Sequence, residues 1–179
     1  MPTQTDYPTL ADLAFTPYLN QDGEMPQNLD GKIGVYAIFD RDRVLQLVYY
    51  SRNIYVSLKQ HLVRQPEKCY WLKAYTISQP SRTLLQDIQT AWIAENQIAP
   101  AGNDRDRTLW LDPIDVKITM SAGDRQTYEK TDEAGKIKLL KQVARRYETK
   151  IVEQLKQRGV ATEIRFNPKL KEQGLLDLK

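Results

Sequence analysis

The chain has 179 residues, of which 41% are hydrophobic and 27% charged, and its formal net charge is +3. This balance predicts a folded globular protein and excludes a disordered chain, and it permits nucleic-acid binding without requiring it. A single cysteine, Cys69, excludes an internal disulfide, and a single histidine, His61, excludes a multi-histidine metal site. There is no signal-peptide pattern and no apolar run of about 18 residues, so we expect a cytoplasmic protein without membrane contact.

The first part of the chain predicts a β-β-α-β-α order in a domain at 31–108, after an N-terminal helix and loop segment at 1–30. Runs of apolar and β-branched residues predict three strands, at 32–40, 44–50 and 69–77. Apolar residues at helical spacing predict a helix over 54–63, which Asn53 or Ser51 would cap. The same periodicity predicts a second helix that Ser81 would cap.

Residues 109–179 predict a C-terminal β-α-β extension. Short strands expected at 115–120 and 160–166 flank the longest helical signal, at 134–158. The outer faces of this amphipathic helix hold eight cations against two glutamates: Lys136, Lys138, Lys141, Arg145, Arg146, Lys150, Lys156 and Arg158 against Glu148 and Glu153. Such a surface is compatible with plain solvation, with the phosphates of DNA or RNA, or with an acidic protein partner.

Four short motifs across residues 30–103 resemble the GIY-YIG nuclease superfamily. They are GVY at 34–36, LVYYSRNI at 47–54, His61, and the P-x-x-N pattern at 100–103. The whole pattern is closer still to the N-terminal domain of plastid monothiol glutaredoxins, and the expected relative is a stand-alone cyanobacterial protein. The resemblance implies an α+β fold with a small, mostly antiparallel sheet.

The resemblance also implies roles for individual residues. If the protein is active, the implied catalytic residues are Tyr36, Ser51 and His61, with Tyr36 positioning or deprotonating the attacking water. The candidate substrate-binding residues, from the resemblance and from the basic helix together, are Arg52, Asn53, Asn103, Lys141, Arg145 and Arg146.

Several positions depart from the nuclease pattern. Tyr49 stands at a glycine position, Ser57 at that of the arginine that stabilises the transition state, and Gln89 at that of the glutamate that binds metal. Phosphodiester hydrolysis develops negative charge that a cation or a metal must meet, and these substitutions remove both. Magnesium or manganese is therefore implied only if the protein is active, and no metal ligand is assigned.

Three functions remain open. The eroded site favours a degenerate nuclease-fold module that binds nucleic acid or a protein. The retained motif residues keep open a metal-dependent DNA endonuclease with a rearranged site. A redox-linked or scaffold interaction protein of cyanobacteria and plastids is the third, although Cys69 is more typical of a buried small hydrophobe than of a reactive thiol.

Overall fold

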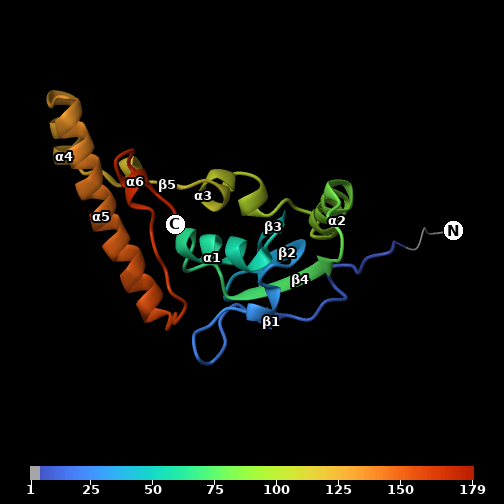
Figure 1. The fold of residues 1–179 in the computed structure, drawn as a ribbon. Helices are drawn as coiled ribbons and strands as arrows, with labels where there is room; N and C mark the ends of the chain where they lie inside the picture. The colour runs from blue at the N-terminus through green and yellow to red at the C-terminus, as the bar shows by residue number, and fades with distance from the viewer. Residues whose placement is uncertain (1–4) are drawn as a thin grey trace. The chain divides into compact units, whose positions relative to one another are not determined.

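The computed structural model describes residues 5–179. The chain divides into two compact units, Met1–Leu111 and Asp112–Lys179 (Figure 1). The fold is α+β, as the sequence predicted. None of the helices in the described part of the chain is long and apolar enough to cross a membrane.

The first unit is built on a four-stranded antiparallel sheet. Its strands are β1 (Thr16–Pro17), β2 (Ile33–Phe39), β3 (Leu45–Ser51) and β4 (Trp71–Ile77). Their order across the sheet is β1-β4-β2-β3, so β3 lies at one edge. The three longer strands confirm the prediction. The two residues of β1 are too few to show an alternating pattern, and they lie in the segment where a helix or a turn was expected.

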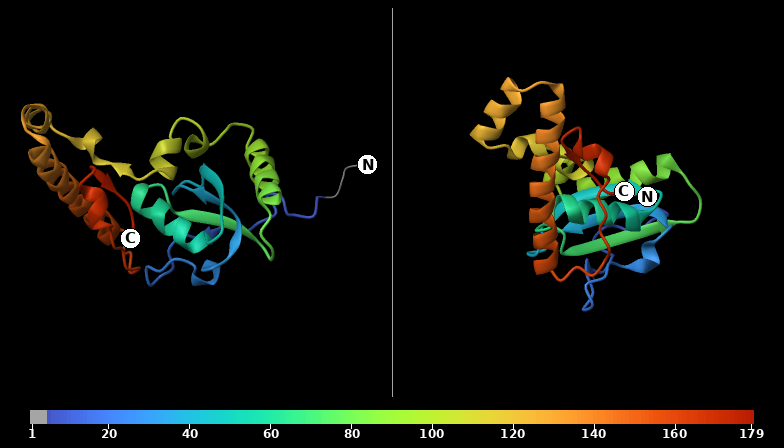
Figure 2. Two further views of the ribbon diagram at one scale, coloured as in Figure 1. Left: turned by 45° about the horizontal axis from the view of Figure 1, so that its top comes forward. Right: turned by 60° about the vertical axis from the view of Figure 1, so that its left-hand side comes forward.

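Two helices cover opposite faces of this sheet (Figures 1 and 2). On one face, α2 (Arg82–Glu95) buries Ile88 and Trp92 against alternate residues of β2 such as Val35. On the other, α1 (Ile54–Arg64) buries a complete apolar stripe. Both predicted caps are confirmed: the side chain of Asn53 accepts a hydrogen bond from the Val56 amide, and that of Ser81 from the Leu84 amide.

Short helices occupy further segments to which the sequence pattern assigns no helix or strand. In the first unit these are the 3-10 helices η1 (Gln27–Leu29) and η2 (Ala101–Asn103) and the helix α3 (Arg107–Leu111). The chain at η2 presses against the edge strand, since a Cβ on Gly102 would lie 2.6 Å from the carbonyl oxygen of Gln46. Residues 101–111 are thereby held beside β3.

The second unit centres on the long helix α5 (Glu133–Gln157), close to its predicted range. A helix that was not predicted, α4 (Ala122–Lys130), precedes it and begins with a capping box between Ser121 and Asp124. After α5 comes the short helix α6 (Pro168–Lys171).

The two strands predicted for the second unit are wrong in place and length. The strand β5 is confined to Ile114–Asp115. Val116–Thr119 forms the 3-10 helix η3, because the side chain of Asp115 accepts a hydrogen bond from the Lys117 amide and turns the chain. Residues 160–166 contribute no strand, and the partner of β5 is β6 (Leu175–Leu176). This pair is a separate two-stranded sheet, not an extension of the first.

Candidate functional site

The candidate catalytic residues Tyr36 and His61 are in direct contact and almost completely buried. Their side chains come from β2 and α1 and are 1% and 2% exposed. The Tyr36 hydroxyl lies 2.7 Å from His61 Nε2, and His61 Nδ1 lies 3.0 Å from the carbonyl oxygen of Trp110. A carbonyl can only accept, so Nδ1 carries the proton and Nε2 accepts the hydrogen bond that Tyr36 donates.

This environment keeps both side chains neutral. Burial, reinforced by the nearby charge of Arg64, lowers the pKa of His61 to about 3, against a weaker opposing effect of the Trp110 carbonyl. Burial also raises the pKa of the Tyr36 hydroxyl far above its usual value. A general base works best with a pKa near the working pH and with access to its substrate, and this pair has neither. Its evident role is to hold β2, α1 and α3 together.

The serine and asparagine side chains of the polar turn at 51–53 are engaged in hydrogen bonds within the protein. The Ser51 hydroxyl accepts hydrogen bonds from the Asn53 amide (3.0 Å) and the Ser57 hydroxyl (2.7 Å), and it donates to the Asn53 carbonyl (2.9 Å). Besides capping α1, Asn53 donates through its amide to Asp30 at 3.0 Å. Of the candidate residues here, Arg52 alone extends into solvent as an exposed cation.

Two amide side chains hold the outer edge of β3. Asn103 accepts from the Val48 amide at 2.8 Å and donates to the Val48 carbonyl at 2.7 Å. Gln89 donates to the same carbonyl at 2.9 Å. These two side chains bind the peptide groups of Val48 as a neighbouring strand would, and we call them the amide clamp. Asn103 was expected to contact substrate, and Gln89 was expected as the remnant of a metal ligand.

The described residues do not fit a divalent metal. Within residues 5–179, no group of three or more His, Cys, Asp or Glu side chains lies close enough together to hold an ion. The carboxylate of Glu95 accepts hydrogen bonds from the Leu10 (3.1 Å) and Ala11 (2.8 Å) amides, which fastens the N-terminal segment to α2. Asp87 is an exposed residue of α2.

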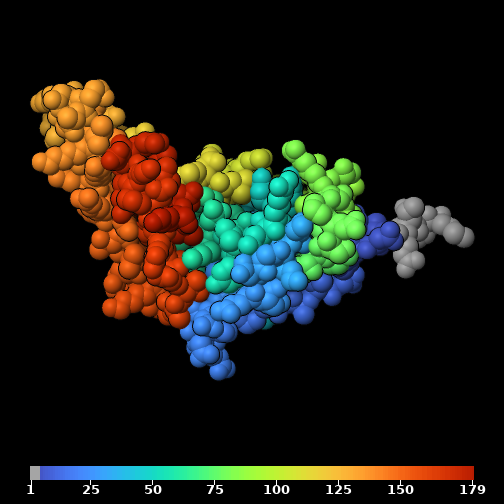
Figure 3. All heavy atoms as spheres, in the orientation of Figure 1, coloured from blue at the N-terminus to red at the C-terminus, as the bar shows by residue number. Residues whose placement is uncertain are grey.

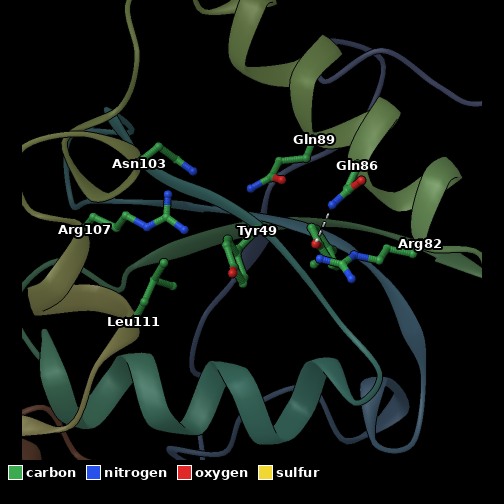
Figure 4. Close-up of a pocket in the computed structure, with 8 residues that line it drawn as sticks. Tyr49, Arg82, Gln86, Gln89, Asn103, Arg107 and Leu111 are labelled. Carbon is green, nitrogen blue, oxygen red and sulfur yellow. Dashed lines mark hydrogen bonds between the residues drawn. The ribbon is translucent and has the colours of Figure 1, made fainter.

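A polar pocket of about 270 Å³ opens beside the clamped edge strand (Figure 4). Its lining contains no carboxylate and consists of Tyr49, Tyr50, Arg82, Gln86, Gln89, Asn103, Arg107 and Leu111. The rings of Tyr49 and Tyr50 are stacked, with centroids 5.2 Å apart and planes 8° from parallel. Gln86 donates to the Tyr50 hydroxyl at 3.3 Å.

Two guanidinium groups enter this pocket from opposite sides. Arg82 comes from α2 and Arg107 from α3, and Figure 4 shows both extending toward Tyr49. Across residues 5–179, neither is ion-paired with a carboxylate. Arg107 was not identified as a site residue from the sequence. It begins α3, and five residues are too few to show a helical period.

The candidate basic residues of α5 separate into two groups. Lys141 and Arg145 line a groove of about 190 Å³ together with Lys169 and Lys171 near α6. Lys141 forms an ion pair with Glu172 at 3.1 Å, and Lys171 forms one with Glu148 at 2.5 Å.

Arg146 points elsewhere. Its guanidinium contacts Asp124 at 2.6 Å and, through that hydrogen bond, holds the pKa of the carboxyl below its usual range. Arg146 therefore joins α4 to α5 and is not part of the groove.

Comparison with known proteins gives a partial match. A 63-residue stretch is 38% identical to the bifunctional monothiol glutaredoxin-S16, chloroplastic, of Arabidopsis thaliana. The match covers 35% of this chain and 22% of that protein, so the chain spans about a fifth of the length of its relative. No family model matches the chain.

Proposed function

We propose that the chain carries a GIY-YIG-type domain whose hydrolytic site is closed, and that it acts as a nucleic-acid-binding module and not as an efficient nuclease. The observation that supports this most is the buried Tyr36–His61 pair, in which both candidate catalysts are neutral and hydrogen-bonded to each other. Ser57 and Gln89, at the positions of the missing cation and metal ligand, are engaged in hydrogen bonds that hold local structure.

The distribution of charge supports nucleic acid as the ligand. The C-terminal unit carries 15 Lys and Arg against 11 Asp and Glu, so the positive charge of the protein is concentrated there. Four of these cations line one groove, of which Lys141 and Lys171 are already paired with glutamates. Arg145 and Lys169 are left to contact phosphate oxygens. Such contacts position the backbone of a nucleic acid without recognising its sequence.

Two other functions stay as alternatives. A metal-dependent endonuclease would need Tyr36 and His61 to become accessible and a metal ligand to be recruited from outside the present arrangement. A redox-linked role gains no support from Cys69, whose side chain is buried and fully shielded from solvent.

The deciding experiment is a nicking assay on supercoiled plasmid with magnesium or manganese. We expect no metal-dependent nicking above that of a buffer control. Nicking by the wild type that is lost in both Tyr36→Phe and His61→Ala would overturn the proposal in favour of the endonuclease.

A gel-shift titration tests the binding part of the proposal. Arg145→Glu is expected to weaken binding to DNA and RNA and to reduce the dependence of affinity on salt. Lys156→Glu is the matched control, because it makes the same charge change on an exposed part of the same helix outside the groove. Equal effects of the two variants would mean that net charge, and not the groove, determines binding.

A further inference from the structure

We infer that the pocket beside β3 binds one nucleotide unit of a single-stranded nucleic acid, with a base against the Tyr49–Tyr50 rings and a phosphate between Arg82 and Arg107. This inference rests on the proposed nucleic-acid binding and adds to it the site and the form of the strand. It concerns the first unit and is independent of the groove on α5 and α6.

The paired tyrosine rings provide the surface for a base. The two rings are stacked on each other and line a polar pocket, and the outer face of such a pair is a flat aromatic surface on which every base can stack whatever its identity. The hydrogen bond from Gln86 to the Tyr50 hydroxyl restrains the position of that ring. The tyrosine pair is therefore already ordered, so that binding of a base costs little conformational entropy in the protein.

The two arginines provide the site for a phosphate. Both guanidinium groups point into a pocket whose lining has no carboxylate, and neither is neutralised by an ion pair within residues 5–179. Guanidinium groups bind phosphate oxygens with two parallel hydrogen bonds, so two of them on opposite walls can grip one phosphate. Arg82, Gln86 and Arg107 are exposed, and α2 and the segment carrying α3 both lie at the surface in the space-filling view (Figure 3).

The combination favours a single strand over the other anionic ligands. In a duplex the bases are stacked on one another and their faces are not available to a tyrosine ring. An acidic peptide would use the arginines but has no need of a flat aromatic face. The amides of Gln89 and Asn103 are occupied by Val48, so recognition of individual bases by these groups is not expected.

The test compares labelled single-stranded DNA, single-stranded RNA and a duplex of the same sequence by fluorescence anisotropy with the full chain. The wild type is expected to bind either single strand more tightly than the duplex. Replacing both tyrosines by leucine should lower single-strand affinity about tenfold and leave duplex affinity unchanged. Replacing both by phenylalanine, which keeps the rings, should retain single-strand affinity.

The arginines are tested separately through the salt dependence of binding. The double variant Arg82→Gln/Arg107→Gln should reduce the slope of log affinity against log salt by about 0.7, the value for the one phosphate contact that the two guanidinium groups share. Arg41→Gln, on the exposed hairpin turn, is the matched control and should not change the slope. These variants decide the question if the leucine pair fails to fold.

The outcomes separate this inference from the proposed function. Equal affinity for single strand and duplex, unchanged in the leucine pair and in the arginine variants, would refute binding at the pocket. It would leave the proposed nucleic-acid binding intact. Absence of binding to all three probes would overturn both. Competition by polyglutamate as effective as that by the single strand would assign the pocket to an acidic protein.

Discussion

The buried His61 makes the stability of the protein depend on pH in a defined direction. Its pKa is lowered from 6.5 to about 3 in the folded state, whereas in the unfolded chain it keeps its ordinary value. Below about pH 6.5 the unfolded state therefore binds one proton more than the folded state, and folding becomes less favourable as the pH falls. The slope for one proton is about 1.4 kcal/mol per pH unit, which gives a loss of about 2 kcal/mol between pH 6.5 and pH 5.

Two measurements check this expectation. Urea unfolding at pH 7 and pH 5 should show that the stability difference between wild type and His61→Asn shrinks at the lower pH, since the variant lacks the titrating ring and the carboxylates contribute equally to both. As His61 is the single histidine of the chain, its ring signals in an NMR spectrum are unambiguous. They should show the neutral form protonated on Nδ1 from pH 7 down to about pH 4.

A particular result would refute the reasoning. If the His61 ring titrates near pH 6.5 in the folded protein, the imidazole is accessible to solvent and the closed-site proposal loses its main support. If the difference in free energy of unfolding between wild type and His61→Asn is the same at pH 7 and pH 5, the proposal of a closed site loses the same support.

Three substitutions in the first unit should each lower the free energy of unfolding, measured by urea titration at pH 7. Tyr36→Phe leaves His61 Nε2 without its donor in a buried site, and about 1–3 kcal/mol is expected. Asn103→Ala leaves the Val48 amide without its acceptor, while Gln89 still donates to the Val48 carbonyl, and a similar loss of about 1–3 kcal/mol is expected. Gly102→Ala forces a Cβ to within 2.6 Å of a backbone oxygen, and a loss of about 1–3 kcal/mol is expected. An unchanged urea midpoint in any of the three variants would refute the corresponding contact.

The parts of the fold that the sequence predicts are those with a long, regular pattern. The seven-residue strands β2, β3 and β4 and the 25-residue helix α5 each bury a repeating set of apolar residues, so their type is visible in the sequence. The predicted strand at 115–120 fails because the side chain of Asp115 bonds to the backbone locally and overrides the β-branched residues that follow.

The candidate site was only partly predictable for a different reason. The motifs single out Tyr36, Ser51, His61 and Asn103, but the contacts of these side chains depend on partners distant in sequence. The carbonyl that binds His61 is 49 residues away, and the backbone group that binds Asn103 is 55 residues away. A histidine on a short helix has the same local pattern whether it faces solvent or Trp110, so its burial appears only once the chain is folded.

The amide clamp on β3 has a consequence for how copies of this chain behave toward one another. An edge strand with open peptide groups is a template on which another chain can add a strand. Asn103 and Gln89 occupy these groups at Val48, near the middle of the strand, with side chains that cannot propagate a sheet. We therefore expect these two side chains to hinder self-assembly through this edge. Replacing both by alanine is expected to promote aggregation as well as to lower stability.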